Sequence, residues 1–162
     1  MTEKLLKLAL LGGLFVGLTI PGGAAHAELL LPGQSIGVNQ TFLSDGNTYT
    51  MMLRSDGNLV LLRKDGKVIW ATGTAGMGAV TAIMQTDGNF VLYTADRRPV
   101  WHTRTQGPHR RFGIDHAGRV VVVMPGKYGN LDLYLKGRSV SDLIASAGGK
   151  FEWKTPANGY GH

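Results

Sequence analysis

The chain repeats itself with a period of 31 residues. At this offset Leu53–Leu62 (LRSDGNLVLL) aligns with Met84–Tyr93 (MQTDGNFVLY), and Trp70–Thr72 aligns with Trp101–Thr103. Each copy therefore holds a hairpin, a strand, a second turn and a strand that ends in Trp-x-Thr. A sheet this small cannot bury one of its faces alone, so the copies must pack against one another. The repeat thus predicts an all-β architecture around a shared core.

A third copy can be traced further along the chain. Asp115–Val123 has the turn and the apolar strand, and Trp153–Thr155 supplies the closing motif. Compared with the other copies, this one contains an insertion of about 22 residues, which we place within 127–150. Three small antiparallel sheets are expected to surround a common axis, with the tryptophans of the closing motifs meeting near it: Trp70, Trp101 and Trp153.

Polar and apolar residues alternate in the second copy, on either side of a turn. We expect Asp87–Asn89 to form a three-residue hairpin loop, with Gly88 or Asn89 in the left-handed conformation and Gln85 opposite Val91. Carboxylate, amide and phenol groups on one face suit a ligand that is dense in hydroxyls, such as a sugar. That face carries Gln85, Asp87, Asn89, Val91 and Tyr93, while Met84, Phe90 and Leu92 face the core.

This face resembles the mannose-binding signature Q-x-D-x-N-x-V-x-Y of the bulb-type (monocot mannose-binding) lectins. The resemblance implies a type II β-prism, in which three four-stranded antiparallel sheets have pseudo-threefold symmetry, over about 29–155. It also implies binding of mannose-containing glycans without a metal or other cofactor. In the family, Asp87 and Asn89 would hold the axial 2-hydroxyl, Gln85 the 3-hydroxyl and Tyr93 the 4-hydroxyl, while Val91 packs on the carbon face of the sugar.

The other copies keep less of this signature. The first retains Asp56, Asn58 and Val60 but has Arg54 for Gln and Leu62 for Tyr, so it is a degenerate second site that is silent or retuned, for example toward an anionic sugar. The third keeps only the apolar contact and is expected to be structural.

Two features leave the assembly of the protein open. The chain has no Cys, so the disulfide of the plant lectins is absent. In the plant dimers the C-terminal strand is exchanged between subunits. A homo-oligomer is therefore one expectation, although the insertion precedes that strand here.

The first 27 residues have the organisation of a signal peptide. Lys4 and Lys7 precede the uncharged apolar run Leu8–Ile20, and Ala25–Ala27 offers a small-x-small cleavage site. The run is short for a membrane span, so an uncleaved anchor is the weaker interpretation. We expect a single lectin-like domain over 28–162, secreted or periplasmic, with no membrane span after processing.

The composition argues against several other functions. No nucleophile with a neighbouring base and no acid–base pair can be identified, so an enzyme is not expected, and the histidines lack zinc-ligand spacing. Nucleic acid is not an expected partner of an exported protein. The net charge of +6 leaves one alternative open. On a degenerate lectin scaffold, an Arg-rich surface could bind a protein or an anionic envelope polymer, in an antibacterial role for instance. Binding to such a partner would be lost as salt rises, whereas binding to a neutral sugar would not.

Overall fold

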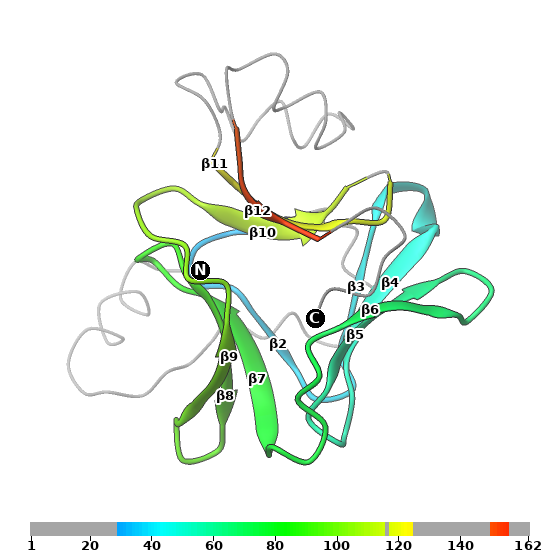
Figure 1. Cartoon of the computed structure of the whole chain (residues 1–162), viewed down its shortest axis with the longest axis horizontal. Helices are drawn as coiled ribbons and strands as arrows, with labels where there is room; N and C mark the ends of the chain where they lie inside the picture. Colours follow the sequence, from blue (N-terminus) through cyan, green and yellow to red (C-terminus); the bar gives the residue numbers. More distant parts are fainter. Residues whose placement is uncertain (1–28, 116, 125–149, 156–162) are drawn as a thin grey trace, which may run out of the picture.

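The computed structural model describes residues 29–115, 117–124 and 150–155, and this part of the chain is built from β-strands with one short 3-10 helix, η3 (Asp45–Asn47). Three four-stranded antiparallel sheets form the three sides of a triangular prism (Figure 1). The expected β-prism is therefore confirmed. In these same ranges no helix has the length and hydropathy of a membrane span. The signal peptide and the insertion predicted within 127–150 lie outside the described residues, apart from Lys150.

Each sheet consists of one repeat plus one outer strand. The first sheet has the order β3 (Thr41–Leu43), β4 (Tyr49–Leu53), β5 (Leu59–Arg63), β6 (Val68–Ala71). The second sheet has the order β2 (Ser35–Gly37), β7 (Ala79–Met84), β8 (Phe90–Thr94), β9 (Pro99–His102). The third sheet has the order β1 (Leu29–Leu30), β10 (Arg111–Ile114), β11 (Val120–Met124), β12 (Lys150–Lys154).

The segment 29–43 supplies an outer strand to all three sheets in turn. β1 pairs with β10, β2 with β7 and β3 with β4, each in the antiparallel sense. The repeat alone did not predict this division of the segment among the three sheets. Because each outer strand covers the edge of a repeat, this segment joins three hairpin units into one body.

The pseudo-threefold symmetry extends to an irregularity in the strands. Trp70 lies opposite Leu61, Trp101 opposite Leu92 and Trp153 opposite Val122. In every repeat the register shifts at the residue that follows this pair, so each sheet carries a β-bulge at the same place. β12 thus takes the place in the third sheet that β6 and β9 take in the first and second.

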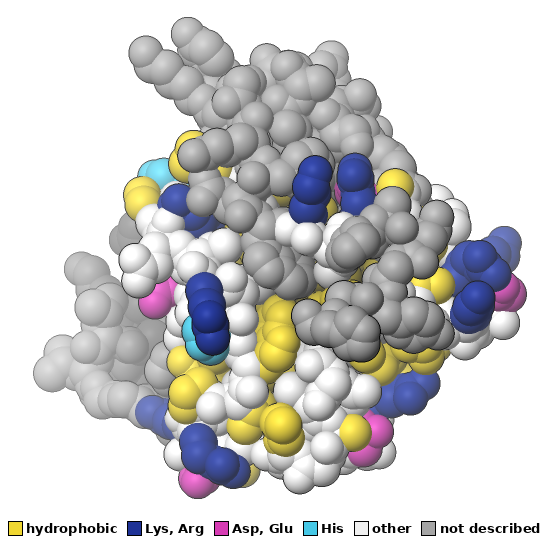
Figure 2. Space-filling view, in the orientation of Figure 1, with side chains coloured by type: hydrophobic (Ala, Val, Ile, Leu, Met, Phe, Trp, Pro, Cys, Tyr) yellow, Lys and Arg dark blue, Asp and Glu magenta, His cyan; other side chains and the backbone are white. Residues whose placement is uncertain are grey.

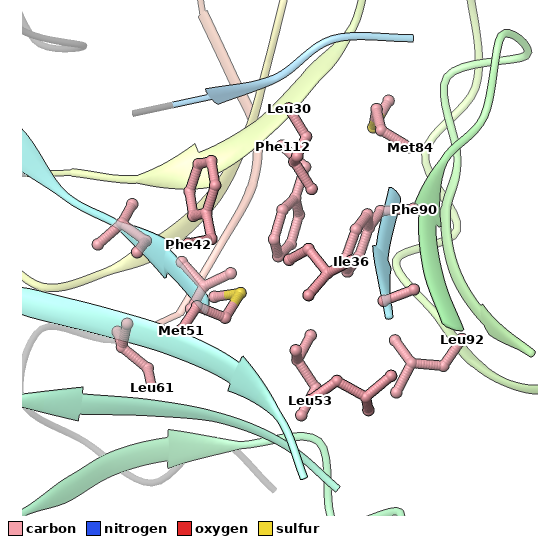
Figure 3. Packing of buried hydrophobic residues seen from close by; sticks show 14 of the residues in the cluster. Leu30, Ile36, Phe42, Met51, Leu53, Leu61, Met84, Phe90, Leu92 and Phe112 are labelled. Carbon is pink, nitrogen blue, oxygen red and sulfur yellow. The ribbon is translucent and has the colours of Figure 1, made fainter. Parts of the chain in front are cut away.

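Apolar side chains from all three sheets fill the centre of the prism (Figure 3). Among the described side chains, each sheet contributes one phenylalanine, namely Phe42, Phe90 and Phe112, and all three are at most 1% exposed. The rings of Phe90 and Phe112 are stacked, with their centroids 3.5 Å apart. The expected tryptophan contact is confirmed for Trp70 and Trp101, whose rings meet edge to face at 5.9 Å. The side chain of Trp153 lies outside the described set.

Candidate functional site

The hairpin between β7 and β8 presents the candidate sugar-binding residues. Gln85 N donates to Asn89 O (2.9 Å) and Gly88 N donates to Gln85 O (3.1 Å), so the loop consists of residues 86–88. Gly88 takes the expected left-handed conformation, with φ 91°. The expected register was wrong: the loop begins one residue earlier than expected, so Gln85 lies opposite Asn89 and not Val91, a shift of two residues in its partner, and Val91 lies opposite Ile83. The cause is the turn type, a type I turn followed by a left-handed glycine, which makes Gly88 the last loop residue.

The error in register does not change the predicted division of side chains between the two faces of the sheet. Met84, Phe90 and Leu92 are fully buried in the core. Gln85, Asn89 and Tyr93 are half-buried on the opposite face, Val91 lies there at 3% exposure, and Asp87 is exposed in the loop. The Gln85 Nε2 group donates to the Tyr93 hydroxyl at 2.7 Å. The structure thus brings all five predicted residues together at one end of the second sheet.

The donor and acceptor groups of Asp87 and Asn89 are fixed by their neighbours. Asp87 Oδ1 accepts from Asn89 N at 2.9 Å. Asn89 Oδ1 accepts from the Thr103 hydroxyl at 3.1 Å, so the Asn89 amide presents its NH₂ group to a ligand. A carboxylate acceptor therefore stands beside an amide donor. This is the combination that a sugar hydroxyl, which both donates and accepts, can satisfy.

Two threonines brace the hairpin, a role that the sequence analysis did not predict. The Thr103 hydroxyl accepts from Phe90 N (3.1 Å) as well as donating to Asn89, and it lies 2.9 Å from the Thr105 hydroxyl. Thr105 in turn donates to Gly88 O at 2.6 Å. A signal was present, since Thr72 and Thr74 occupy the corresponding positions of the first repeat, but only the first threonine of each pair was included in the Trp-x-Thr motif.

The third repeat has an ion pair where the second has its ligand-directed groups. Asp115 takes the position of Gln85 and Arg119 that of Asn89, as shown by the equivalent hydrogen bond from Asp115 N to Arg119 O. The two side chains form a salt bridge of 2.5 Å, and Asp115 is 1% exposed. These groups satisfy each other, which agrees with the expectation that this copy is structural.

Three left-handed residues distinguish the second repeat from the first. Arg97, Arg104 and His109 have φ of 64°, 59° and 64°, whereas the first repeat has glycine at each equivalent position (Gly66, Gly73 and Gly78). A side chain in this conformation costs roughly 1–2 kcal/mol, which glycine avoids. Arg104 and His109 belong to the loop after β9, which braces the hairpin through Gly107 N and Asp87 O at 2.6 Å.

We predict that Arg104→Gly is more stable than a matched substitution at Arg98. Arg98 is also exposed but has ordinary backbone geometry, so glycine there is expected to cost about 0.5–1 kcal/mol. At Arg104 the relief of the left-handed strain offsets that cost. Urea denaturation should separate the two variants by about 1 kcal/mol or more. Equal stabilities would show that the backbone at Arg104 is not strained.

Basic side chains do not collect into one patch on the face shown in Figure 2. Lys and Arg are spread around the molecule over several elements (Figure 2). This distribution is that of a solvated surface. Within the described ranges, no group of three or more His, Asp or Glu side chains is placed to hold a metal ion.

Several solved structures with the same fold are lectins. The Japanese Marasmius oreades lectin is 25% identical with a TM-score of 0.63, over 83% of this chain and 95% of that one. The mannose-specific agglutinin from snowdrop (Galanthus nivalis) bulbs, complexed with methyl-α-D-mannoside, is 28% identical with a TM-score of 0.53, over 59% and 87%. The Polygonatum cyrtonema lectin, complexed with monomannoside, is 27% identical with a TM-score of 0.56, over 63% and 94%. No protein-family model and no curated protein sequence matches the chain.

Proposed function

Because this chain is a bulb-type lectin domain, we propose that it binds α-mannose-type glycans through the second repeat, without a metal ion and without catalysis. The observation that carries the proposal is the pair formed by Asp87 and Asn89. The Asp87 carboxylate can accept hydrogen bonds from a ligand, and the Asn89 amide can donate them. Both side chains are held in place by hydrogen bonds that leave this acceptor and this donor available. Mannose has an axial 2-hydroxyl, which the family's use of these two positions would place between them.

The rest of the face supports the same ligand. Gln85 and Tyr93 are joined by a hydrogen bond, so their remaining donors and acceptors have a fixed direction toward neighbouring hydroxyls. Val91, at 3% exposure on the same face, stands where the family places the apolar contact to the carbon face of the sugar. Asp87 with Asn89 and Gln85 with Tyr93 form two pairs of sugar-directed groups on one hairpin. Together they would form a shallow site. A monovalent dissociation constant in the millimolar range, about −4 kcal/mol, is expected.

A titration followed by NMR tests this proposal. Methyl α-D-mannoside should shift the Asn89 side-chain amide, and the glucose epimer, with its equatorial 2-hydroxyl, should shift it far less. Asn89→Ala should raise the dissociation constant at least tenfold, or about 1.4 kcal/mol, because the amide donor is lost. Asn58→Ala, at the same position of the first repeat, is the control and should leave mannoside binding unchanged. Treatment with EDTA should have no effect.

Two results would count against mannoside binding at this site. One is the absence of any shift with mannoside or oligomannose, which would favour the protein or anionic-polymer alternative. The other is equal binding by Asn89→Ala, which would place the sugar elsewhere.

Export of the protein is the second part of the proposal. The basic start, apolar run and cleavage site of residues 1–27 support a secreted or periplasmic protein whose mature chain begins at Glu28. A single weak site gains avidity when glycans or protein copies are clustered, so a homo-oligomer fits this role. Mass spectrometry of the exported protein should show Glu28 as the first residue. Retention of residues 8–20 would favour an anchored protein.

A further inference from the structure

The first repeat reproduces the hydrogen-bonded frame of the second. Arg54 N donates to Asn58 O at 2.9 Å, as Gln85 N does to Asn89 O. Asp56 Oδ1 accepts from Asn58 N at 2.8 Å, and Asn58 Oδ1 accepts from the Thr72 hydroxyl at 3.2 Å. The Thr74 hydroxyl donates to Gly57 O at 2.7 Å. The acceptor and donor of Asp56 and Asn58 are therefore as fixed as those of the intact signature.

The burial of the first repeat also matches that of the second. From Arg54 to Leu62 and from Gln85 to Tyr93, every residue falls in the same class of exposure at the offset of 31. Val60 is 1% exposed beside the outward groups, as Val91 is at 3%. The first repeat thus retains the surface on which a sugar could rest, including its apolar floor.

What differs is the pair of residues at positions 54 and 62. In the second repeat Gln85 donates to the Tyr93 hydroxyl, but Leu62 offers no acceptor to Arg54. Arg54 is half-buried on the outward face, and within the described residues its guanidinium group has no hydrogen bond or ion pair. Five N–H donors and a full positive charge therefore stand beside the hydroxyl-binding pair.

The third repeat shows that this fold can neutralise an arginine on the same surface. There Arg119 is paired with Asp115, which occupies the position that corresponds to Arg54. The first repeat has no such carboxylate at that position. Asp56 lies in the loop and Arg54 directly follows β4, and within the described residues the two side chains form no ion pair.

We propose that the first repeat is a second binding site, specific for an acidic saccharide. Its hydroxyls would contact Asp56 and Asn58, its carbon face would pack on Val60 and Leu62, and its oxyanion would bind the Arg54 guanidinium. A guanidinium group matches carboxylate and phosphate in a two-pronged geometry, and these charge-assisted hydrogen bonds are stronger than those of an amide. The replacement of Gln by Arg and of Tyr by Leu thereby changes the ligand class and does not simply remove the site.

The test uses the full mature chain carrying Asn89→Ala, so that mannoside binding at the second repeat is suppressed. Three probes are titrated separately: D-mannuronate for a carboxylate, mannose 6-phosphate for a phosphate ester, and methyl α-D-mannoside as the neutral sugar. The readouts are the NMR signals of the Asn58 side-chain amide and the Gly57 backbone amide. At least one acidic sugar should shift both signals, and the neutral sugar should not. Which acid binds more tightly distinguishes the two oxyanions.

Two variants isolate the role of Arg54. Arg54→Gln restores the residue of the second repeat at an outward position and should weaken binding of the acidic sugar at least tenfold. Arg54→Lys keeps the positive charge but loses the planar, two-pronged guanidinium group. Its affinity for the acidic sugar should therefore fall between that of the Arg54→Gln variant and that of the parent. Raising the salt concentration should weaken binding to the Arg54 protein and have little effect on the Gln variant.

The proposal is overturned if neither acidic sugar shifts the Asn58 signal, or if Arg54→Gln binds as well as the parent. It is also overturned if inorganic phosphate alone gives the same shifts and affinity, which would reduce the site to an anion contact without sugar recognition. Because these signals belong to the first repeat, such a failure leaves mannoside binding at Asn89 untouched. The two proposals can therefore fail separately.

Discussion

Phe90→Ala is expected to lower the free energy of unfolding by about 3–5 kcal/mol, the usual cost of truncating a large buried aromatic side chain. Phe90 is fully buried, its ring stacks on Phe112 at 3.5 Å, and it meets Trp101 edge to face at 6.5 Å. The stack joins the second sheet to the third, so its loss opens the centre of the prism. For a domain with about 5–15 kcal/mol of stability, a loss of this size leaves little margin. Urea denaturation followed by tryptophan fluorescence measures it.

Val80→Ala is the matched control for this truncation. Val80 belongs to β7 of the same sheet but is 40% exposed, so its substitution should change stability by no more than about 0.5 kcal/mol. A Phe90→Ala protein as stable as Val80→Ala would contradict a core shared by the three sheets.

Gly88→Ala is expected to damage both the fold and the candidate site. Gly88 has φ 91°, and a Cβ atom there would lie 2.2 Å from the Gly107 carbonyl oxygen and 2.8 Å from Gly107 N. The left-handed strain costs about 1–3 kcal/mol, and the clash forces the hairpin away from the loop after β9. Since that hairpin carries Asp87 and Asn89, mannoside binding should be lost together with at least about 2 kcal/mol of stability.

Gly66→Ala separates the two contributions. Gly66 is also left-handed, with φ 82°, but a Cβ atom there would meet nothing within 4 Å. Its substitution should therefore lower stability only by the cost of placing a residue with a Cβ atom in the left-handed conformation, about 1 kcal/mol. Mannoside binding should stay intact. If Gly88→Ala behaved like Gly66→Ala in both denaturation and sugar titration, the close approach of Gly107 would have no role in holding the site.

One frame supports three different surface chemistries in this domain. The hairpin, the bulge and the first threonine of the brace (Thr72, Thr103 and Thr155) recur. The outward residues change from Gln and Tyr in the second repeat to Arg and Leu in the first. In the third repeat they become the salt-bridged Asp115 and Arg119. The core positions beneath these residues stay apolar and buried in every copy. Outward residues are free to vary because the packing of the prism does not depend on them.

The sequence by itself determined the repeat, the class of fold and the face on which the candidate residues lie. These conclusions rest on period and alternation, since Met84, Phe90 and Leu92 must be buried and their neighbours along a strand must then face outward. The error of one residue in the position of the loop did not change the face on which these residues lie. Gln85 and Val91 are an even number of positions apart, so they stay on the same side of the sheet.

Only the tertiary structure decided the hairpin register, the outer strands and the brace. Asp-Gly-Asn allows a left-handed residue at either of its last two positions, and the choice of Gly88 comes from its close approach to Gly107. β1 has two residues, too few for a periodic pattern, so its pairing with β10 depends on the assembled prism. Thr105 lies 17 residues from Gly88, and their hydrogen bond exists because the closing strand brings the two loops together. Local sequence contains no information on such contacts until the sheets have packed.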